Sequence, residues 1–169
     1  MDELRAAGPD DVAELVRLRA VMLADLGRDP GPAVGGWRPV AAQWFGERLD
    51  RPQEWAFRVV AADGGHVRAC GAAWLTEHLP GPRAPRGYRG YVGFMCTEPA
   101  ARGQGCARRI LRDLLGWLER QDVTRIELHA SPAGHSLYRS EGFADDAAVP
   151  MYRDVSRAGS ATAGTPTRR

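Results

Sequence analysis

The chain contains no lysine and no asparagine, although 23 of its 169 residues are basic. All of these basic residues are arginine, and isoleucine occurs only at Ile110 and Ile126. Without lysine there is no Schiff-base amine and no Walker phosphate lysine, which excludes pyridoxal enzymes and P-loop NTPases. The abundance of Arg, Ala and Gly is typical of a GC-rich coding sequence, and a net charge of +2 is too small to indicate a nucleic-acid partner.

Cysteine and long apolar runs are also scarce. The three cysteines, Cys70, Cys96 and Cys106, form no Cys-x-x-Cys pair, which argues against a disulfide framework or a zinc ribbon and favours a reducing compartment. The acidic N-terminus has no signal-peptide core, and no stretch approaches the roughly 18 apolar residues of a membrane span. His129 and His135 lack a third ligand at metal spacing. We therefore expect a cytoplasmic protein with no metal and no membrane association.

The hydrophobic pattern predicts one mixed α/β domain over residues 1–155, followed by a disordered tail over residues 156–169. Apolar spacings of three and four predict helices, and alternation between turn signals predicts strands. The expected helices cover residues 9–27, 40–49, 105–120 and 136–142, and the expected strands cover residues 55–62, 66–75, 91–97, 124–130 and the region near 151–155.

The most informative segment runs from a strand through a Gly-Gln-Gly loop directly into an amphipathic helix. Gly103 and Gly105 allow close approach of a ligand to the backbone, and the first amides of the helix have no internal partners. Such a loop either binds a phosphate or is an ordinary turn before a helix. A dinucleotide fingerprint is excluded, because Arg108 stands where its third glycine would be.

Two motifs together resemble the GNAT superfamily of acetyl-CoA-dependent N-acetyltransferases. Residues 102–107, Arg-Gly-Gln-Gly-Cys-Ala, match its Arg/Gln-x-x-Gly-x-Gly/Ala signature, and Pro99 precedes the arginine as is usual there. Residues 137–143, Leu-Tyr-Arg-Ser-Glu-Gly-Phe, resemble its Leu-Tyr-x-x-x-Gly-Phe motif at the customary distance. The resemblance implies a mostly antiparallel sheet with a splayed parallel strand pair and flanking helices.

The resemblance also implies where acetyl-CoA binds. The backbone amides of the loop would hold the pyrophosphate, and the edge of the preceding strand would pair with the pantetheine arm, with an amide near Met95 or Cys96 as the oxyanion hole. The implied cofactor residues are Met95, Cys96, Thr97, Arg102, Gly103, Gln104, Gly105, Cys106, Ala107 and Arg108. Ser131 stands where many members have an asparagine that holds the pantetheine.

Tyr138 is the implied general acid. A phenol with a pKa near 10 stays protonated at neutral pH and can donate to the departing thiolate. The strand position at which some members carry a basic carboxylate is Tyr91 here, so the base is open. Glu77, His78 and Glu98 are candidates, and loss of the proton to water is a further alternative.

The acceptor site is the least defined part of the prediction. Loops between the first two helices often form the acceptor wall in similar proteins, which makes Trp37 a candidate acceptor contact, together with Glu77 and His78. Ordinary packing of Trp37 is the alternative.

We predict an N-acetyltransferase that moves acetyl from acetyl-CoA to a primary amine of a small molecule, by direct attack in a ternary complex. The alternatives are an acyl-CoA sensor without efficient catalysis and a protein or peptide N-acetyltransferase. A homodimer is carried over from similar proteins. Nucleic-acid binding through Arg83, Arg86, Arg89 and the terminal arginines Arg168 and Arg169 is not expected, because the loop arginines alternate with Pro and Gly and nearby acids balance them.

Overall fold

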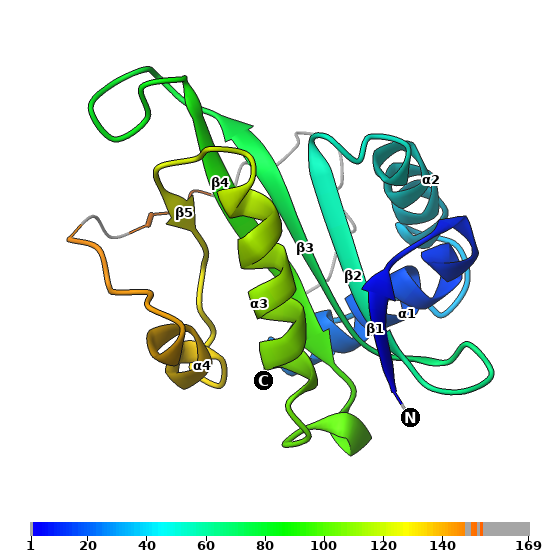
Figure 1. Ribbon diagram of the computed structural model, residues 1–169. Coiled ribbons are helices and arrows are strands. Elements are labelled where there is room, and N and C mark those ends of the chain that lie inside the picture. The colour runs from blue at the N-terminus through cyan, green and yellow to red at the C-terminus, as the bar shows by residue number, and fades with distance from the viewer. Residues whose placement is uncertain (1, 148–149, 152, 154–169) are drawn as a thin grey trace, which may run out of the picture.

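A computed structural model describes residues 2–147, 150–151 and 153 of the chain. A five-stranded mixed sheet in the order β1-β2-β3-β4-β5 forms its centre (Figure 1). The strands are β1 (Glu3–Ala6), β2 (Trp55–Ala61), β3 (Val67–Glu77), β4 (Tyr88–Thr97) and β5 (Ile126–Glu127), and the α-helices are α1 (Val12–Asp25), α2 (Arg38–Leu49), α3 (Cys106–Glu119) and α4 (His135–Ser140). The sheet is antiparallel except for the parallel β4–β5 pair, which confirms the predicted fold class.

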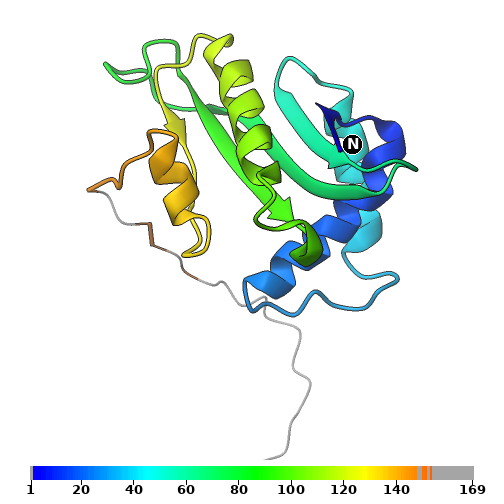
Figure 2. The ribbon, with the colours of Figure 1, turned by 60° about the horizontal axis from the view of Figure 1, so that its bottom comes forward.

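The helices cover the two faces of the sheet separately (Figures 1 and 2). On one face, the apolar side of α3 packs its fully buried Ile110, Leu111 and Leu114 against Ala73 and Val92 of the sheet. On the opposite face, Leu15 and Leu18 of α1 and Phe45 of α2 pack against Val59 and Cys70. Because side chains alternate along a strand, each central strand supplies both cores.

The parallel pair is much shorter than the sequence predicts. Gly90 pairs with Ile126 and Tyr91 pairs with Glu127, where the ladder ends, although β4 continues to Thr97 and the expected strand covered residues 124–130. The two strands therefore separate beyond Tyr91, as the predicted splay requires. α4 follows β5 and lies near the N-terminal part of α3 (Figure 1).

Differences at the chain ends have simple causes. β1 was not predicted as a strand, because four residues are too few for a visible alternation; its antiparallel register with β2 forms it. The strand expected near residues 151–155 and the tail at residues 156–169 fall almost wholly outside the described residues.

Candidate active site

The loop between β4 and α3 presents a set of free backbone amides. Gly103 (φ 76°) and Gly105 (φ 80°) adopt the left-handed conformation that favours glycine, and a Cβ at either would meet nothing within 4 Å. In the described residues, the amides of residues 103–108 donate to no backbone carbonyl. The next amide, that of Arg109, donates to Gly105 O at 3.1 Å. The amides of residues 105–108, which include that of the buried Cys106, thus point out of the helix N-terminus. They fit the phosphates of a coenzyme.

The side chains around this loop are already engaged in the described structure. Arg102 pairs with Asp25 at 2.5 Å and donates from Nε to Thr97 O, while Gln104 donates to Ala100 O at 3.0 Å. For an anion at this loop, the backbone amides are therefore the available donors, and Arg102 would contribute only after exchanging its partner.

A β-bulge in β4 sets the direction of its amides. Cys96 pairs with Cys70 and Gly93 with Ala72, so Gly71 faces both Phe94 and Met95, and Phe94 has a positive φ of 53°. Glu98 N donates to Arg68 O on the β3 side. Since amides alternate along a strand, that of Cys96 also faces β3, and that of Thr97 points the other way, toward the side of β4 on which β5 lies.

The packing of Gly71 shows why the bulge persists. A Cβ at Gly71 would lie 2.5 Å from Met95 Sδ and 2.6 Å from Ile110 Cγ2. The Met95 side chain therefore fills the space above this glycine and packs on the α3 side, whereas Phe94 packs on the opposite side and stacks on Phe45. No local sequence signal predicts this bulge, because the contacts that hold it are long-range.

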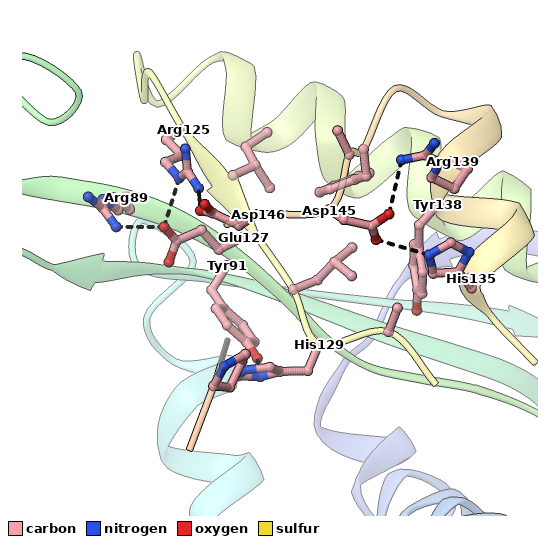
Figure 3. A pocket seen from close by; sticks show the side chains of 16 residues that line it. Arg89, Tyr91, Arg125, Glu127, His129, His135, Tyr138, Arg139, Asp145 and Asp146 are labelled. Atoms are coloured by element: carbon pink, nitrogen blue, oxygen red, sulfur yellow. Dashed lines mark hydrogen bonds and ion pairs between the residues drawn. The ribbon is translucent and has the colours of Figure 1, made fainter. Parts of the chain in front are cut away.

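Tyr138 on α4 lies in a cavity of about 650 Å³ beside the separated strands (Figure 3). Its side chain is buried, its ring meets Phe143 edge-on at 6.0 Å, and Gly134 provides room for it. Burial raises the pKa of Tyr138, and the nearby Tyr91 raises it further. The phenol therefore stays protonated well above neutral pH and can act as an acid.

α4 is tied to the first turns of α3 by one carboxylate. Glu141 pairs with Arg108 at 3.2 Å and Arg112 at 2.9 Å, and Arg108 also donates to Ser140 Oγ. The two guanidinium groups, Arg112 above all, lower the pKa of Glu141 and keep it charged. The helix that carries Tyr138 is thus fixed to α3, which begins at the loop of Gly103 and Gly105.

The thiols near the site are not nucleophiles. All three cysteines are buried, and burial raises the pKa of Cys96 to about 11 and that of Cys70 as well. A thiolate is the reactive form of cysteine, so Cys70 and Cys96 are unsuited to forming an acyl-enzyme.

The remaining sequence candidates lie in other surroundings. Ser131 Oγ accepts a hydrogen bond from Gly134 N at 3.3 Å in the turn before α4. Trp37 directly precedes α2 as its N-cap, donates from Nε1 to Pro30 O at 2.9 Å and packs against the α1–α2 core. Glu77, at the end of β3, is opposite Tyr88 of β4 in the strand register, and His78 Nδ1 lies 2.9 Å from Leu79 O. None of these four residues lines the Tyr138 cavity.

Another candidate base, Glu98, belongs to an ion-pair cluster on the opposite side of the loop. Its carboxylate pairs with Arg17 and with His66 Nε2 at 2.9 Å, and the Arg17 guanidinium also pairs with Glu14. This cluster joins α1 to the β2–β3 turn.

Sequence reasoning missed several polar residues that line the Tyr138 cavity. Tyr91 Oη lies 2.5 Å from His129 Nδ1, and Glu127 accepts from Arg89 at 2.6 Å and from Arg125 at 2.9 Å. The alternation along residues 125–129 could have placed Glu127 and His129 on one face, but only the β4–β5 register places them beside Tyr91.

Neither a metal cluster nor a membrane helix is found in the part of the chain that is described. There, no three His, Cys, Asp or Glu side chains are grouped so as to hold an ion. Likewise, no described helix is long and apolar enough to cross a bilayer.

Comparisons with known proteins agree with this geometry. The family model of the GNAT acetyltransferases matches residues 23–143, which is more than half of the chain. The chain belongs to the GNAT acetyltransferase family. The family prediction from the two motifs is thus confirmed, and with it the prediction of an acyltransferase.

Solved structures show the same fold. An acetyltransferase from Clostridium acetobutylicum, solved with acetyl-CoA, is 25% identical with a TM-score of 0.79, covering 90% of this chain and 96% of its own. A GCN5-related N-acetyltransferase from Ralstonia eutropha is 22% identical with a TM-score of 0.78, covering 92% and 99%. Glucosamine-6-phosphate N-acetyltransferase from Arabidopsis thaliana is 14% identical with a TM-score of 0.70, covering 92% and 99%. No curated protein sequence matches the chain.

Proposed function

We propose that this GNAT acetyltransferase moves acetyl from acetyl-CoA to a primary amine of a small molecule, by direct attack in a ternary complex. The observation that carries the proposal is the end of the β4–β5 ladder at Tyr91 and Glu127, which opens a gap next to the Tyr138 cavity. The gap is bordered by the β4 edge, and the phosphate loop follows the end of that strand.

The residues divide the work of cofactor binding. The amides of residues 103–108 would hold the pyrophosphate, and those of Met95 and Thr97 would face the pantetheine arm and the thioester, with the Met95 amide polarising the carbonyl. The Cys96 amide is unsuited to that role, because Cys96 pairs with Cys70 and its amide faces β3. Acetyl-CoA supplies the thioester that the amine attacks. Ser131 would contact the arm through its hydroxyl, which can still donate while Oγ accepts from Gly134 N.

Tyr138 would protonate the sulfur as the carbon–sulfur bond breaks. Its buried ring and raised pKa suit an acid that must hold its proton until the thiolate forms. Direct attack is favoured over an acyl-enzyme because the cysteines are buried and the pKa values of Cys70 and Cys96 are raised.

A small acceptor is favoured by the size of the cavity. About 650 Å³ lies within the range of small-molecule sites, and aromatic, cationic and anionic side chains all line it. Trp37, Glu77 and His78 would contact only the outer part of an acceptor, because they do not line this cavity.

Thiol release from acetyl-CoA in the presence of an amine panel tests the proposal. The panel holds amino acids, polyamines, aminoglycosides, simple alkylamines, and a peptide with a free N-terminus and a lysine. Release with small amines above the peptide rate supports the proposal. Tight acetyl-CoA binding without release for any amine would instead favour an acyl-CoA-binding module, and peptide preference would favour a protein acetyltransferase.

A further inference from the structure

Tyr91 and His129 form a hydrogen-bonded pair at the point where β4 and β5 separate (Figure 3). Tyr91 Oη lies 2.5 Å from His129 Nδ1, and the two ring centroids are 5.8 Å apart. Tyr91 is the last β4 residue of the parallel ladder, and both side chains line the Tyr138 cavity. The pair therefore faces the place where an amine would meet the thioester.

The sheet fixes this pair from below. The ring of Tyr91 packs against Trp74 of β3 with centroids 4.6 Å apart, and Trp74 stacks on Trp55 of β2 at 5.0 Å. A Cβ at Gly93 would lie 2.7 Å from Trp74 Cη2, so only glycine leaves Trp74 room over β4. These contacts hold the Tyr91 ring in one orientation beneath His129.

The proposed chemistry requires one protonation state of the pair. A phenol that donates to Nδ1 requires a neutral imidazole with its proton on Nε2. The Tyr91 oxygen can then accept a hydrogen bond from a cationic donor while its own proton lies on the line toward His129. Imidazole is the side chain whose charge changes between pH 5 and 8, which suits a proton acceptor at neutral pH.

We propose that Tyr91 and His129 remove the proton that an acceptor ammonium must lose before it can attack. The substrate ammonium donates a proton to Tyr91 Oη while the Tyr91 hydroxyl proton moves to His129 Nδ1. The products of this step are a neutral amine, an unchanged phenol and an imidazolium, which later releases its proton to water. This assignment rests on the proposed N-acetyltransferase function and completes it with the base that the sequence left open.

In the later steps, the neutral amine attacks the thioester and Tyr138 transfers the protons. The amine nitrogen forms a bond to the thioester carbon, the carbon–sulfur bond breaks, and Tyr138 gives its proton to the sulfur. The second proton of the amine nitrogen returns to Tyr138. One proton reaches the thiol, one reaches water through His129, and one stays on the amide.

Several charged groups face the pair from the surrounding elements. Those from β4, β5, α4 and the following segment are Arg89, Arg125, Glu127, His135, Tyr138, Arg139, Asp145 and Asp146. Most are committed to ion pairs: Glu127 with Arg89 and Arg125, and Asp145 with His135 at 3.1 Å and Arg139 at 3.3 Å. Among these groups, Tyr91 and His129 bring a phenol oxygen and an imidazole nitrogen into direct contact.

The kinetic test compares two small amines in thiol release at pH 7. Ethylamine is an ammonium at this pH and must lose a proton, whereas hydroxylamine is already unprotonated. Tyr91→Phe and His129→Gln should lower kcat/KM for ethylamine by about 100-fold or more, within the range of general base catalysis. The same variants should change kcat/KM for hydroxylamine by less than about threefold.

Tyr88→Phe and His66→Gln are the matched controls. Tyr88 is half exposed at the start of β4, and His66 lies in the β2–β3 turn, so both should leave the two rates unchanged. Equal losses with both amines in Tyr91→Phe would overturn the relay, because a merely structural role does not depend on the charge of the amine.

Nitrogen-15 NMR of the whole chain tests the pair without any acceptor. The expected spectrum shows His129 protonated at Nε2 and bare at Nδ1, with the Nδ1 resonance moving in Tyr91→Phe. A proton on Nδ1 in the neutral imidazole would overturn the relay. Failure of the wild type to acetylate either amine counts against the proposed function instead, and the NMR result then decides on the pair alone.

Discussion

The two ends of β4 offer different atoms to a ligand. At its C-terminal end, the loop to α3 presents backbone amides, while its side chains bind other parts of the protein. Near its start, Tyr91 and its neighbours present side chains, and the backbone is taken up by the sheet. The first end should tolerate side-chain changes that keep the loop conformation, and the second should not.

The largest expected effect is for Tyr138, whose side chain lines the same cavity as Tyr91. Tyr138→Phe should lower kcat by about 10²- to 10³-fold, because a phenyl ring fills the same space but cannot protonate the sulfur. Stopped-time thiol release with the best amine of the panel measures it, with Tyr88→Phe as control. An unchanged kcat would remove Tyr138 from the chemistry.

In the loop between β4 and α3, which offers backbone amides, replacing a glycine should have the largest effect on acetyl-CoA binding. At Gly105, φ is 80°, where a β-branched residue is strained although its Cβ would meet no atom within 4 Å. Gly105→Val should weaken acetyl-CoA binding by about tenfold or more, since about 1–2 kcal/mol of strain turns the amides away. Calorimetry measures the affinity. Gly64→Val, at another open left-handed position in the β2–β3 turn, should leave it unchanged.

Loss of the Glu141 ion pairs that join α4 to α3 should have an intermediate effect on kcat. Glu141→Gln weakens the ion pairs with Arg108 and Arg112 that hold α4 on α3. A displaced Tyr138 should lower kcat by about tenfold, because small errors in position are costly in catalysis. Arg86→Gln, which breaks the exposed Arg86–Asp122 pair, is the control. If both variants keep full kcat, α4 does not need this tie.

The smallest effect is expected for a side chain in the loop itself. Gln104 makes one exposed hydrogen bond to Ala100 O, and its proposed role belongs to its backbone amide. Gln104→Ala should change acetyl-CoA affinity by about twofold or less, as one exposed hydrogen bond is worth about 0.5 kcal/mol. A tenfold loss in the same calorimetric assay would show that the side chain binds the coenzyme.

The comparison also explains what the sequence could predict. The glycine loop, the α3 apolar face and the Tyr138 motif are local patterns, so the motifs at residues 102–107 and 137–143 predict the family, and the hydrophobic pattern over residues 1–155 predicts the fold class. The bulge at Phe94, the early end of β5 and the Tyr91–His129 contact depend on register between distant segments. The periodicity of a single sequence carries no such information, so the sequence offers Glu77, His78 and Glu98 as candidate bases and does not indicate the Tyr91–His129 pair.

Acetyl-CoA binding by Tyr138→Phe and Gly105→Val, measured side by side by calorimetry, tests the division between the two ends of the site most directly. The account predicts that Tyr138→Phe keeps the wild-type affinity within about twofold, whereas Gly105→Val loses about tenfold or more. Equal losses in the two variants, or full affinity in Gly105→Val, would contradict it.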